Sequence, residues 1–331
     1  MKPRAPRNRT ISLSSADRKR LSKKLLFIEN NSGQRIPLNS TLCGDYRKLI
    51  PLLPEASVDL IILDPPYNLE KKFNGSRFGR KSVDAYTDYL REILSCLMPV
   101  LKKTATIYIC GDWFSSVSIY TAASEFFIVR NRITWEREKG RGAQKNWKNS
   151  SEDIWFCTVS NEYTFNVDDV KLRRKVIAPY RLDDGTPKDW KETKSGNYRD
   201  TAPSNIWNDI TIPFWSMPEN TDHPTQKSEK LIARLILAGS NPGDLVLDPF
   251  LGSGTTSVVA KKLNRKYLGI EMEKEYCLLA ERRLELADED RSIQGFTGGV
   301  FWERNTLSDQ TRSNTNGSSV GKKDNKRVTP K

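Results

Sequence analysis

The residues best suited to chemistry are an aspartate, two prolines and a tyrosine that close an apolar run. The run 58–63 is rich in β-branched and apolar side chains, which predicts a buried strand. Pro65 and Pro66 cannot continue the hydrogen bonding of a sheet, so the chain is expected to leave the strand there. Asp64 and Tyr67 should therefore lie at the carboxyl end of a strand, where open α/β sheets bind their ligands.

A second group of such residues follows the predicted strand 245–248, which ends at Asp248 and passes into a glycine-bearing turn. Gly252 and Gly254 allow the backbone to turn sharply and to approach a ligand closely. The third glycine of a dinucleotide-binding loop is absent, and Asp248 disfavours a phosphate but suits an ammonium group. Glu271 ends the next predicted strand, where an acid can accept hydrogen bonds from ribose hydroxyls. S-adenosylmethionine, which carries both a ribose and a cationic amino group, fits this pattern better than NAD.

Strands and helices alternate around both groups, which predicts an α/β fold with a largely parallel sheet. Residues 136–222 break this alternation. There, lysines and arginines are interleaved with aromatic and amide side chains, a composition that suits phosphate contacts and the reading of base edges. The alternative is a loop-rich insertion with surface charge, because the acidic residues of this segment nearly balance its basic ones.

Composition narrows the classes of protein that the chain can belong to. Its 331 residues carry a formal charge of +13, which predicts a polyanionic partner such as nucleic acid. No apolar run approaches the ~20 residues that a membrane helix needs, and no secretory signal is expected. The 5 cysteines are scattered without a C-x-x-C pair and there is 1 histidine, which argues against a metal site, a disulfide framework and a Ser-His-Asp triad.

Both groups, together with the stretch 223–227, resemble the bacterial DNA amino-methyltransferases. The motif 64–67 precedes the glycine motif, and a long variable segment separates them, an order similar to the beta group of type II restriction-modification enzymes. The resemblance covers roughly residues 42–287 and departs at Ser228, where the family often has proline; serine also suits a helix start. It implies a Rossmann-like, S-adenosylmethionine-dependent methyltransferase fold, circularly permuted, with a mixed, mostly parallel sheet and an inserted target-recognition region.

The resemblance also implies a division of the chain. A basic arm comes first, followed by the catalytic half of the methyltransferase domain, the target-recognition region, the cofactor-binding half and a polar tail. The arm either lies along phosphates or is a solvated tail. The final segment has few apolar residues, so it is expected to be disordered. The boundaries are 1–39, 40–135, 136–222, 223–290 and 291–331.

The resemblance assigns roles to individual residues. Asp64, Pro65, Pro66 and Tyr67 are expected to be catalytic: the carboxylate and the Pro65 carbonyl accept the N–H groups of the target amino group, and Tyr67 stacks on the flipped base. Asp45 is expected near the cofactor adenine, unless it only forms an Asx turn. His223 is either part of the cofactor pocket or a structural turn residue. The residues expected at the cofactor are Asp45, Asp64, His223, Thr225, Gln226, Lys227, Asp248, Pro249, Phe250, Gly252, Ser253, Gly254, Thr255 and Glu271.

The expected activity is methyl transfer from S-adenosylmethionine to the N6 amino group of adenine in a specific double-stranded DNA sequence. Cytosine N4 is the close alternative, but enzymes of that type more often have serine in place of the first aspartate. Protein-glutamine methyltransferases usually begin the motif with asparagine, and a non-catalytic DNA-binding subunit would have lost one of the two motifs. A cognate restriction endonuclease in a separate chain and a second copy of this chain are the further partners considered. Location in the cytoplasm, at the nucleoid, is expected.

Overall fold

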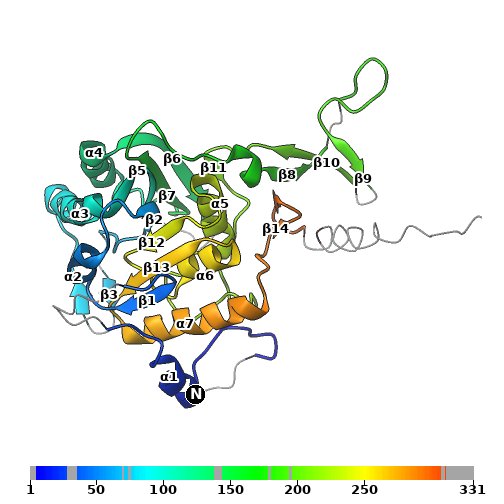
Figure 1. Ribbon diagram of the computed structural model, residues 1–331. Helices are drawn as coiled ribbons and strands as arrows, with labels where there is room; N and C mark the ends of the chain where they lie inside the picture. Colours follow the sequence, from blue (N-terminus) through cyan, green and yellow to red (C-terminus); the bar gives the residue numbers. More distant parts are fainter. Residues whose placement is uncertain are drawn as a thin grey trace, which may run out of the picture.

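The computed structural model describes residues 5–27, 36–68, 71–73, 76–137, 144–177, 180–193, 196–306 and 310. At its centre is an eight-stranded sheet in the order β1-β13-β12-β2-β5-β7-β6-β11 (Figure 1). Its strands run parallel apart from β7, which pairs antiparallel with both β5 and β6. The predicted mixed, mostly parallel sheet is confirmed. The strands are β1 Ser40–Cys43, β2 Val58–Leu63, β5 Leu101–Gly111, β6 Ile128–Glu136, β7 Ser151–Thr158, β11 Ile206–Trp207, β12 Leu245–Asp248 and β13 Lys266–Glu271.

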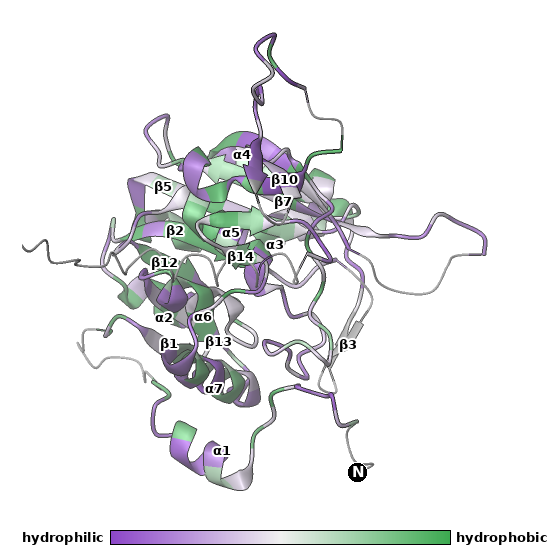
Figure 2. Cartoon of the chain, turned by 90° about the vertical axis from the view of Figure 1, so that its right-hand side faces the viewer, coloured by the Kyte–Doolittle hydropathy of each residue, from purple (hydrophilic) through white to green (hydrophobic). Residues whose placement is uncertain are grey.

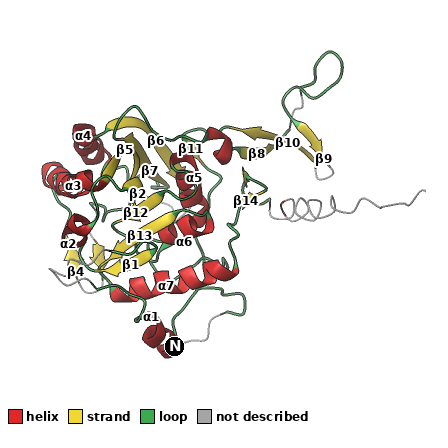
Figure 3. Ribbon diagram, viewed as in Figure 1, coloured by secondary structure: helices red, strands yellow, loops and turns green. Residues whose placement is uncertain are grey.

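Helices cover both faces of this sheet, as the red and yellow layers of Figure 3 show. On β2, Ile61 and Leu63 pack toward α2, α3 and α4, whereas Leu60 and Ile62 pack toward α5 and α6. Because both faces are buried, β2 needs apolar side chains at successive positions, and the strand is correspondingly hydrophobic in Figure 2. The helices are α2 Tyr46–Leu49, α3 Val83–Leu97, α4 Ser116–Phe126, α5 Glu229–Gly239, α6 Thr255–Lys262 and α7 Lys274–Glu289, with 3-10 turns η1 Ile50–Leu52, η2 Met98–Val100 and η3 Val167–Val170.

Four neighbouring strands, β1, β13, β12 and β2, end at the same edge of the sheet because they run parallel. Asp64 follows β2, Asp248 ends β12 and Glu271 ends β13. The carboxylates that the sequence placed at three separate strand ends therefore share one edge. Open α/β sheets bind ligands at such an edge.

A smaller mixed sheet, antiparallel except where β15 pairs with β8, projects from the central one and holds part of the region predicted to recognise DNA (Figure 1). The region 136–222 also contributes to the central sheet, because β7 and β11 lie within it. The disorder expected for the tail was wrong for residues 291–306, where two further strands join the small sheet. The small sheet consists of β14, β15, β8 Leu172–Lys175, β10 Gly196–Thr201 and β9 Lys191–Thr193, with β14 Phe296–Thr297 and β15 Val300–Trp302.

The tail folds because its few apolar residues are concentrated in its first dozen positions. Phe301 and Trp302 are fully buried, and Phe301 packs in the same core cluster as α5. An average over 291–331 dilutes this concentration, which is why composition alone predicted disorder. The residues 307–309 and 311–331 lie outside the described part of the chain.

The basic N-terminal arm lies against α7. Its helix α1, Ser15–Leu21, begins at a capping box formed by Ser14 and Asp17. Arg18 pairs with Glu275 at 2.6 Å and Lys24 with Glu285 at 2.8 Å, both acids being on α7. These two cations of the arm are thus paired within the protein, so this helix packs on α7 and is not a free solvated tail.

A two-stranded hairpin, β3 Lys71–Phe73 and β4 Ser76–Phe78, follows the motif 64–67.

Within the described residues, no helix is both long enough and apolar enough to cross a membrane.

Candidate active site

The motif 64–67 is held rigidly at the end of β2. The Tyr86 hydroxyl, from α3, donates to the Pro66 carbonyl at 3.1 Å. Asn68 then fastens the chain to Lys81 by two hydrogen bonds, of 2.7 and 3.0 Å. The prolines stop the strand and these contacts fix the turn that follows, so Asp64 is presented at the sheet edge as the sequence predicted.

The Asp64 carboxylate is the centre of a compact polar cluster. Its Oδ2 accepts a hydrogen bond from Lys227 Nζ at 2.7 Å, and its Oδ1 lies 3.0 Å from the Tyr67 hydroxyl. Glu152, which β7 brings into the site, places its Oε2 3.4 Å from Lys227 Nζ and 3.3 Å from the Tyr67 hydroxyl. Arg137 forms an ion pair with the other oxygen of Glu152. The cluster contains two carboxylates and two cations, so its formal charge is zero.

The protonation states in this cluster follow from burial and charge. Lys227 is only 9% exposed. Burial alone would lower the pKa of Lys227, but Asp64 and Glu152 outweigh it and hold that pKa above its ordinary value. Burial, followed by the charges of the same two carboxylates, raises the pKa of Tyr67. At neutral pH the cluster therefore contains an ammonium and an un-ionised phenol.

The glycine loop after β12 is braced from within by Asp248. The carboxylate accepts hydrogen bonds from Phe250 N at 3.0 Å and from the Thr256 hydroxyl at 2.6 Å. Gly254 has a φ of +88° and packs against α7, where an added Cβ would lie 2.6 Å from the Ala280 Cβ. The loop therefore depends on glycine at this position. Pro249 and Ser253 belong to the same turn between β12 and α6.

Glu271 supports the loop from the neighbouring strand. Its Oε2 accepts from Gly252 N at 2.9 Å and its Oε1 from Glu273 N at 2.8 Å. Its carbonyl accepts from Gly44 N at 2.9 Å, which joins the end of β1 to the site. Each carboxylate oxygen has a second lone pair, so Glu271 can also accept hydrogen bonds from a ligand hydroxyl.

Asp45 follows β1 and is the N-cap of α2. Its carboxylate accepts from Arg47 N at 3.0 Å and forms an ion pair with the Arg47 side chain at 2.6 Å. These hydrogen bonds from Arg47 lower the pKa of Asp45. The Asx turn that the sequence left open is therefore present, and the neighbouring Tyr46 ring packs on Phe250 of the glycine loop at 5.0 Å.

The stretch 223–227 contacts the glycine loop through His223 and the start of α6 through Lys227. His223 faces the glycine loop: a Cβ on Gly252 would lie 3.1 Å from its Nε2, and its ring meets Tyr276 at 4.4 Å. Burial, and after it the positive charge of Lys227, lowers the pKa of His223 to about 4. Its imidazole is therefore neutral at pH 7. Thr255 donates to the Lys227 carbonyl at 3.2 Å, which ties this stretch to the start of α6.

The side chains of Gln226 and Lys227 are both bonded to other protein groups. The side chain of Gln226 is occupied by the segment before it, accepting from the Thr221 hydroxyl at 2.6 Å and donating to the Glu219 carbonyl at 2.7 Å. The ammonium of Lys227 is directed at the Asp64 carboxylate. Thr225 lies with Arg137, Glu152 and His223 along one small hollow beside this cluster.

Glu152 is the site residue that the sequence analysis missed. The only signal was a pair of acids, 152 and 153, at the start of the apolar stretch that became β7. An acid directly before an apolar strand usually remains at the surface, yet Glu152 is buried. Its place in the site depends on β7 running antiparallel to β5, a reversal that local patterns do not reveal.

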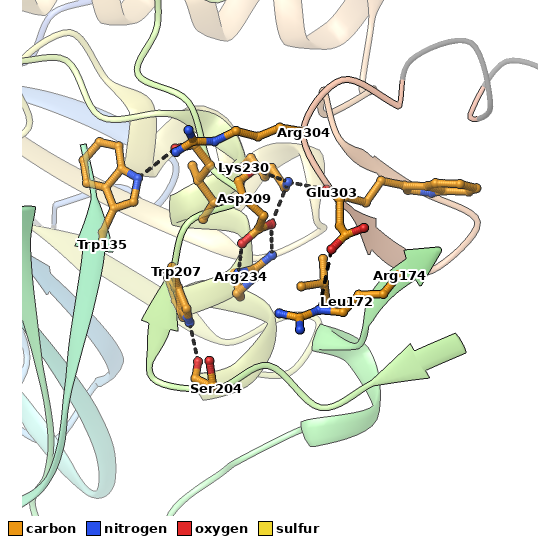
Figure 4. Close-up of polar contacts among 12 residues, drawn as sticks. Trp135, Leu172, Arg174, Ser204, Trp207, Asp209, Lys230, Arg234, Glu303 and Arg304 are labelled. Carbon is orange, nitrogen blue, oxygen red and sulfur yellow. Dashed lines mark hydrogen bonds and ion pairs between the residues drawn. The ribbon is translucent and has the colours of Figure 1, made fainter. Parts of the chain in front are cut away.

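A separate buried ion cluster joins the small sheet to α5 (Figure 4). The Asp209 carboxylate pairs with Arg234 at 2.7 Å and with Lys230 at 2.8 Å, and Lys230 also donates to the Trp302 carbonyl. Arg304 donates to the Ile210 carbonyl at 3.0 Å. The segment that ends the described chain is thus fixed to the helix that begins two residues after Lys227.

Removal of Asp209 is expected to destabilise the protein strongly. Asp209→Ala leaves the buried cations of Arg234 and Lys230 without their anion, which should lower the free energy of unfolding by about 3–5 kcal/mol. Asp168→Ala is the matched control, because Asp168 pairs with Lys171 at 2.8 Å but is 81% exposed. That variant should lose no more than ~1 kcal/mol in denaturant unfolding. Equal losses in the two variants would contradict this assignment.

The known proteins that this chain resembles are DNA methyltransferases. A family model described as DNA methylase matches residues 58–282. DNA adenine methyltransferase YhdJ of Escherichia coli (strain K12) is 36% identical over 249 residues, 74% of this chain and 82% of that protein. Type II methyltransferase M.HpaI of Haemophilus parainfluenzae is 36% identical over 247 residues, 74% of this chain and 73% of that protein.

The solved structure of the PvuII DNA methyltransferase (cytosine-N4-specific) aligns with a TM-score of 0.56 and 18% identity. The alignment covers 76% of this chain and 90% of the PvuII chain. At this identity the likeness bears on the fold alone. The family-model match, 58–282, spans both the motif 64–67 and the glycine loop, so the two halves of the site fall within one family domain.

Proposed function

The chain belongs to the family of N6/N4 DNA methylases, and on that basis we propose that it transfers a methyl group from S-adenosyl-L-methionine to the exocyclic N6 amino group of adenine in a specific sequence of double-stranded DNA. The observation that carries the proposal is the placement of Asp64 beside a glycine loop braced by Asp248, at the ends of adjacent parallel strands. One strand end supplies an acceptor for an amino group and the other a cradle for a nucleoside with a cationic tail.

The residues of the cradle suit this cofactor. Gly252 and Gly254 have φ values of +54° and +88°, so the loop follows a tight left-handed path that glycine adopts without strain. Asp248 offers a buried carboxylate to the ammonium group, and Glu271 offers acceptors to the ribose hydroxyls. The ring of Phe250, packed on Tyr46, supplies an apolar surface for a nucleobase. Bound S-adenosylmethionine supplies a methyl group on a positively charged sulfur.

An exocyclic amino nitrogen is a weak nucleophile, because its lone pair is delocalised into the ring. The motif 64–67 is suited to make this nitrogen more nucleophilic. The Asp64 carboxylate accepts one N–H and the Pro65 carbonyl the other. Two acceptors placed off the ring plane favour a pyramidal nitrogen with a localised lone pair. Positioning would then supply much of the rate, because these two acceptors would hold the nitrogen toward the methyl group of the cofactor. The methylated nitrogen would pass its extra proton to Asp64 or to solvent. Tyr67 supplies the face on which the target base stacks.

The target base reaches this site only after leaving the duplex, which costs a few kcal/mol. Cationic and aromatic side chains of the recognition region would offset that cost through phosphate contacts and stacking. Trp147 is 93% exposed and adjoins Lys145 and Lys148 in sequence. Such a side chain suits contact with DNA rather than packing within the protein. We propose that the protein methylates DNA in the cytoplasm.

Adenine is preferred over cytosine N4 because the motif begins with aspartate. The test is incubation of the protein and S-adenosylmethionine with mixed-sequence duplex DNA, followed by nucleoside analysis. N6-methyladenine is expected. N4-methylcytosine would transfer the assignment to the alternative base, while leaving the roles of Asp64 and the glycine loop unchanged.

Two partners belong to this proposal in addition to DNA. A cognate restriction endonuclease in a separate chain would cut the unmethylated form of the same sequence, a pairing consistent with the type II name of M.HpaI. A second copy of this chain would form a homodimer. Light scattering on the purified protein, with and without target DNA, distinguishes a monomer from a dimer.

Cofactor binding is expected to release a proton. Burial raises the pKa of Asp248 to about 7, so the carboxyl is partly protonated at neutral pH. A bound ammonium group favours the ionised form, so cofactor affinity should rise as pH increases from about 6 to 8. Calorimetry in buffers of different ionisation enthalpy measures the released proton. Asp248→Asn should remove this share of the release, and an unchanged release in that variant would contradict the role of Asp248.

A further inference from the structure

The Lys227 ammonium has three acceptors around it, and all three belong to the catalytic cluster. They are Asp64 Oδ2 at 2.7 Å, the Tyr67 hydroxyl at 3.1 Å and Glu152 Oε2 at 3.4 Å. We propose that Glu152 is a positioning residue for methyl transfer, which takes over the Lys227 ammonium when the target amino group displaces that ammonium from Asp64. This inference rests on the proposed function and adds a specific role to a residue that no sequence motif identified.

The geometry provides the second position that such a displacement needs. The shortest contact of Lys227 is with Asp64, the same carboxylate that must accept the target N–H. Glu152 Oε2 is 0.7 Å further from the ammonium (3.4 Å against 2.7 Å), so a small movement of the flexible lysine side chain is sufficient. Arg137 pairs with Oε1 of Glu152 and thereby fixes that carboxylate while Oε2 remains directed at Lys227.

Charge makes the second acceptor necessary. A buried ammonium that loses its anion is strongly disfavoured, so Lys227 leaves Asp64 only if another carboxylate receives it. An Asp64 carboxylate that remains paired with Lys227 is a weaker acceptor, because the cation neutralises the charge that attracts the amino N–H groups. Glu152 therefore keeps Asp64 available without leaving a bare charge in the site.

The cluster also accounts for the orientation of Tyr67. Its hydroxyl lies 3.0 Å from Asp64 and 3.3 Å from Glu152, so its single proton can go to either carboxylate. When Lys227 moves onto Glu152, the phenol can still donate to Asp64. The ring that stacks on the target base would then keep its place through the exchange.

The test compares Glu152→Gln in two backgrounds by single-turnover methyl transfer. With Lys227 present, Glu152→Gln should slow transfer on the order of 100-fold, because the ammonium stays on Asp64. In a Lys227→Met background, the same change should alter the rate by no more than about threefold, since no ammonium remains to be relocated. Within each background, Glu152→Gln should change the dissociation constants for DNA and cofactor little, and thermal unfolding checks that each variant is folded.

A purely structural role predicts a different pattern. Glu152→Gln would then lower stability or ligand affinity and slow transfer equally in both backgrounds, and that result would overturn the proposal. A single variant as fast as the wild type would overturn it as well. Should Glu152→Gln fail to fold, Glu152→Asp, which keeps the charge but shortens the side chain, is compared in the same two backgrounds. If the wild type methylates no DNA, the proposed function fails first, before this comparison begins.

Discussion

Replacement of Asp64 by alanine is expected to abolish methyl transfer, slowing the reaction by at least about 10³-fold. The variant loses the acceptor that localises the lone pair of the target amino nitrogen, and no other described carboxylate occupies that position. Its fold should survive, because Lys227 keeps Glu152 as a buried counter-ion once Asp64 is gone. The affinities for DNA and cofactor should therefore remain close to those of the wild type.

Single-turnover transfer of a labelled methyl group measures the rate, and titration calorimetry measures the two affinities. Asp64→Asn is the graded control, because it keeps a carbonyl acceptor of similar shape but loses the negative charge. Its rate should fall between those of the wild type and the alanine variant. An alanine variant that transfers methyl within about tenfold of the wild-type rate would refute the role of Asp64.

The second large effect is expected at Gly254. Alanine there places its Cβ 2.6 Å from the Ala280 Cβ and 2.8 Å from its Cα, in a backbone with a φ of +88°. The turn and α7 must separate, and the loop that we assign to the cofactor then loses its shape. Overpacking of this kind costs about 1–3 kcal/mol, in addition to the strain of a left-handed backbone, so cofactor affinity should fall at least tenfold.

Gly243→Ala is the matched control for this change. Gly243 has a nearly identical φ of +90°, yet nothing lies within 4 Å of an added Cβ. That variant carries the same backbone strain without the clash, so it should lose about 1 kcal/mol of stability and keep its cofactor affinity. If both variants bind the cofactor equally well, the packing of Gly254 against α7 does not shape the cofactor site.

Local chemistry explains which parts of the site could be predicted from the sequence. An apolar run that stops at two prolines and a strand that enters a glycine turn are short patterns, and each fixed a strand end correctly. Asp64, Asp248 and Glu271 are brought to one edge because their strands are parallel neighbours. The alternation of strands and helices was sufficient to predict that arrangement.

Features that depend on distant pairing could not be predicted in the same way. Glu152 reaches the cluster because β7 reverses direction, and Lys227 reaches it from the start of α5, 75 residues further along the chain. The side chain of Gln226 is bonded to the segment 219–221, a contact that no local pattern indicated. Folding of 291–306 depends on a strand partner, β8, in another part of the chain.

The most direct test of the account is whether DNA is the methyl acceptor. Purified protein is incubated with S-adenosylmethionine carrying a labelled methyl group, with mixed-sequence duplex DNA or without DNA. The account predicts label in the DNA of the wild-type reaction and none in that of the Asp64→Ala reaction. Absence of label from every DNA offered to a folded, cofactor-binding wild-type protein would contradict it.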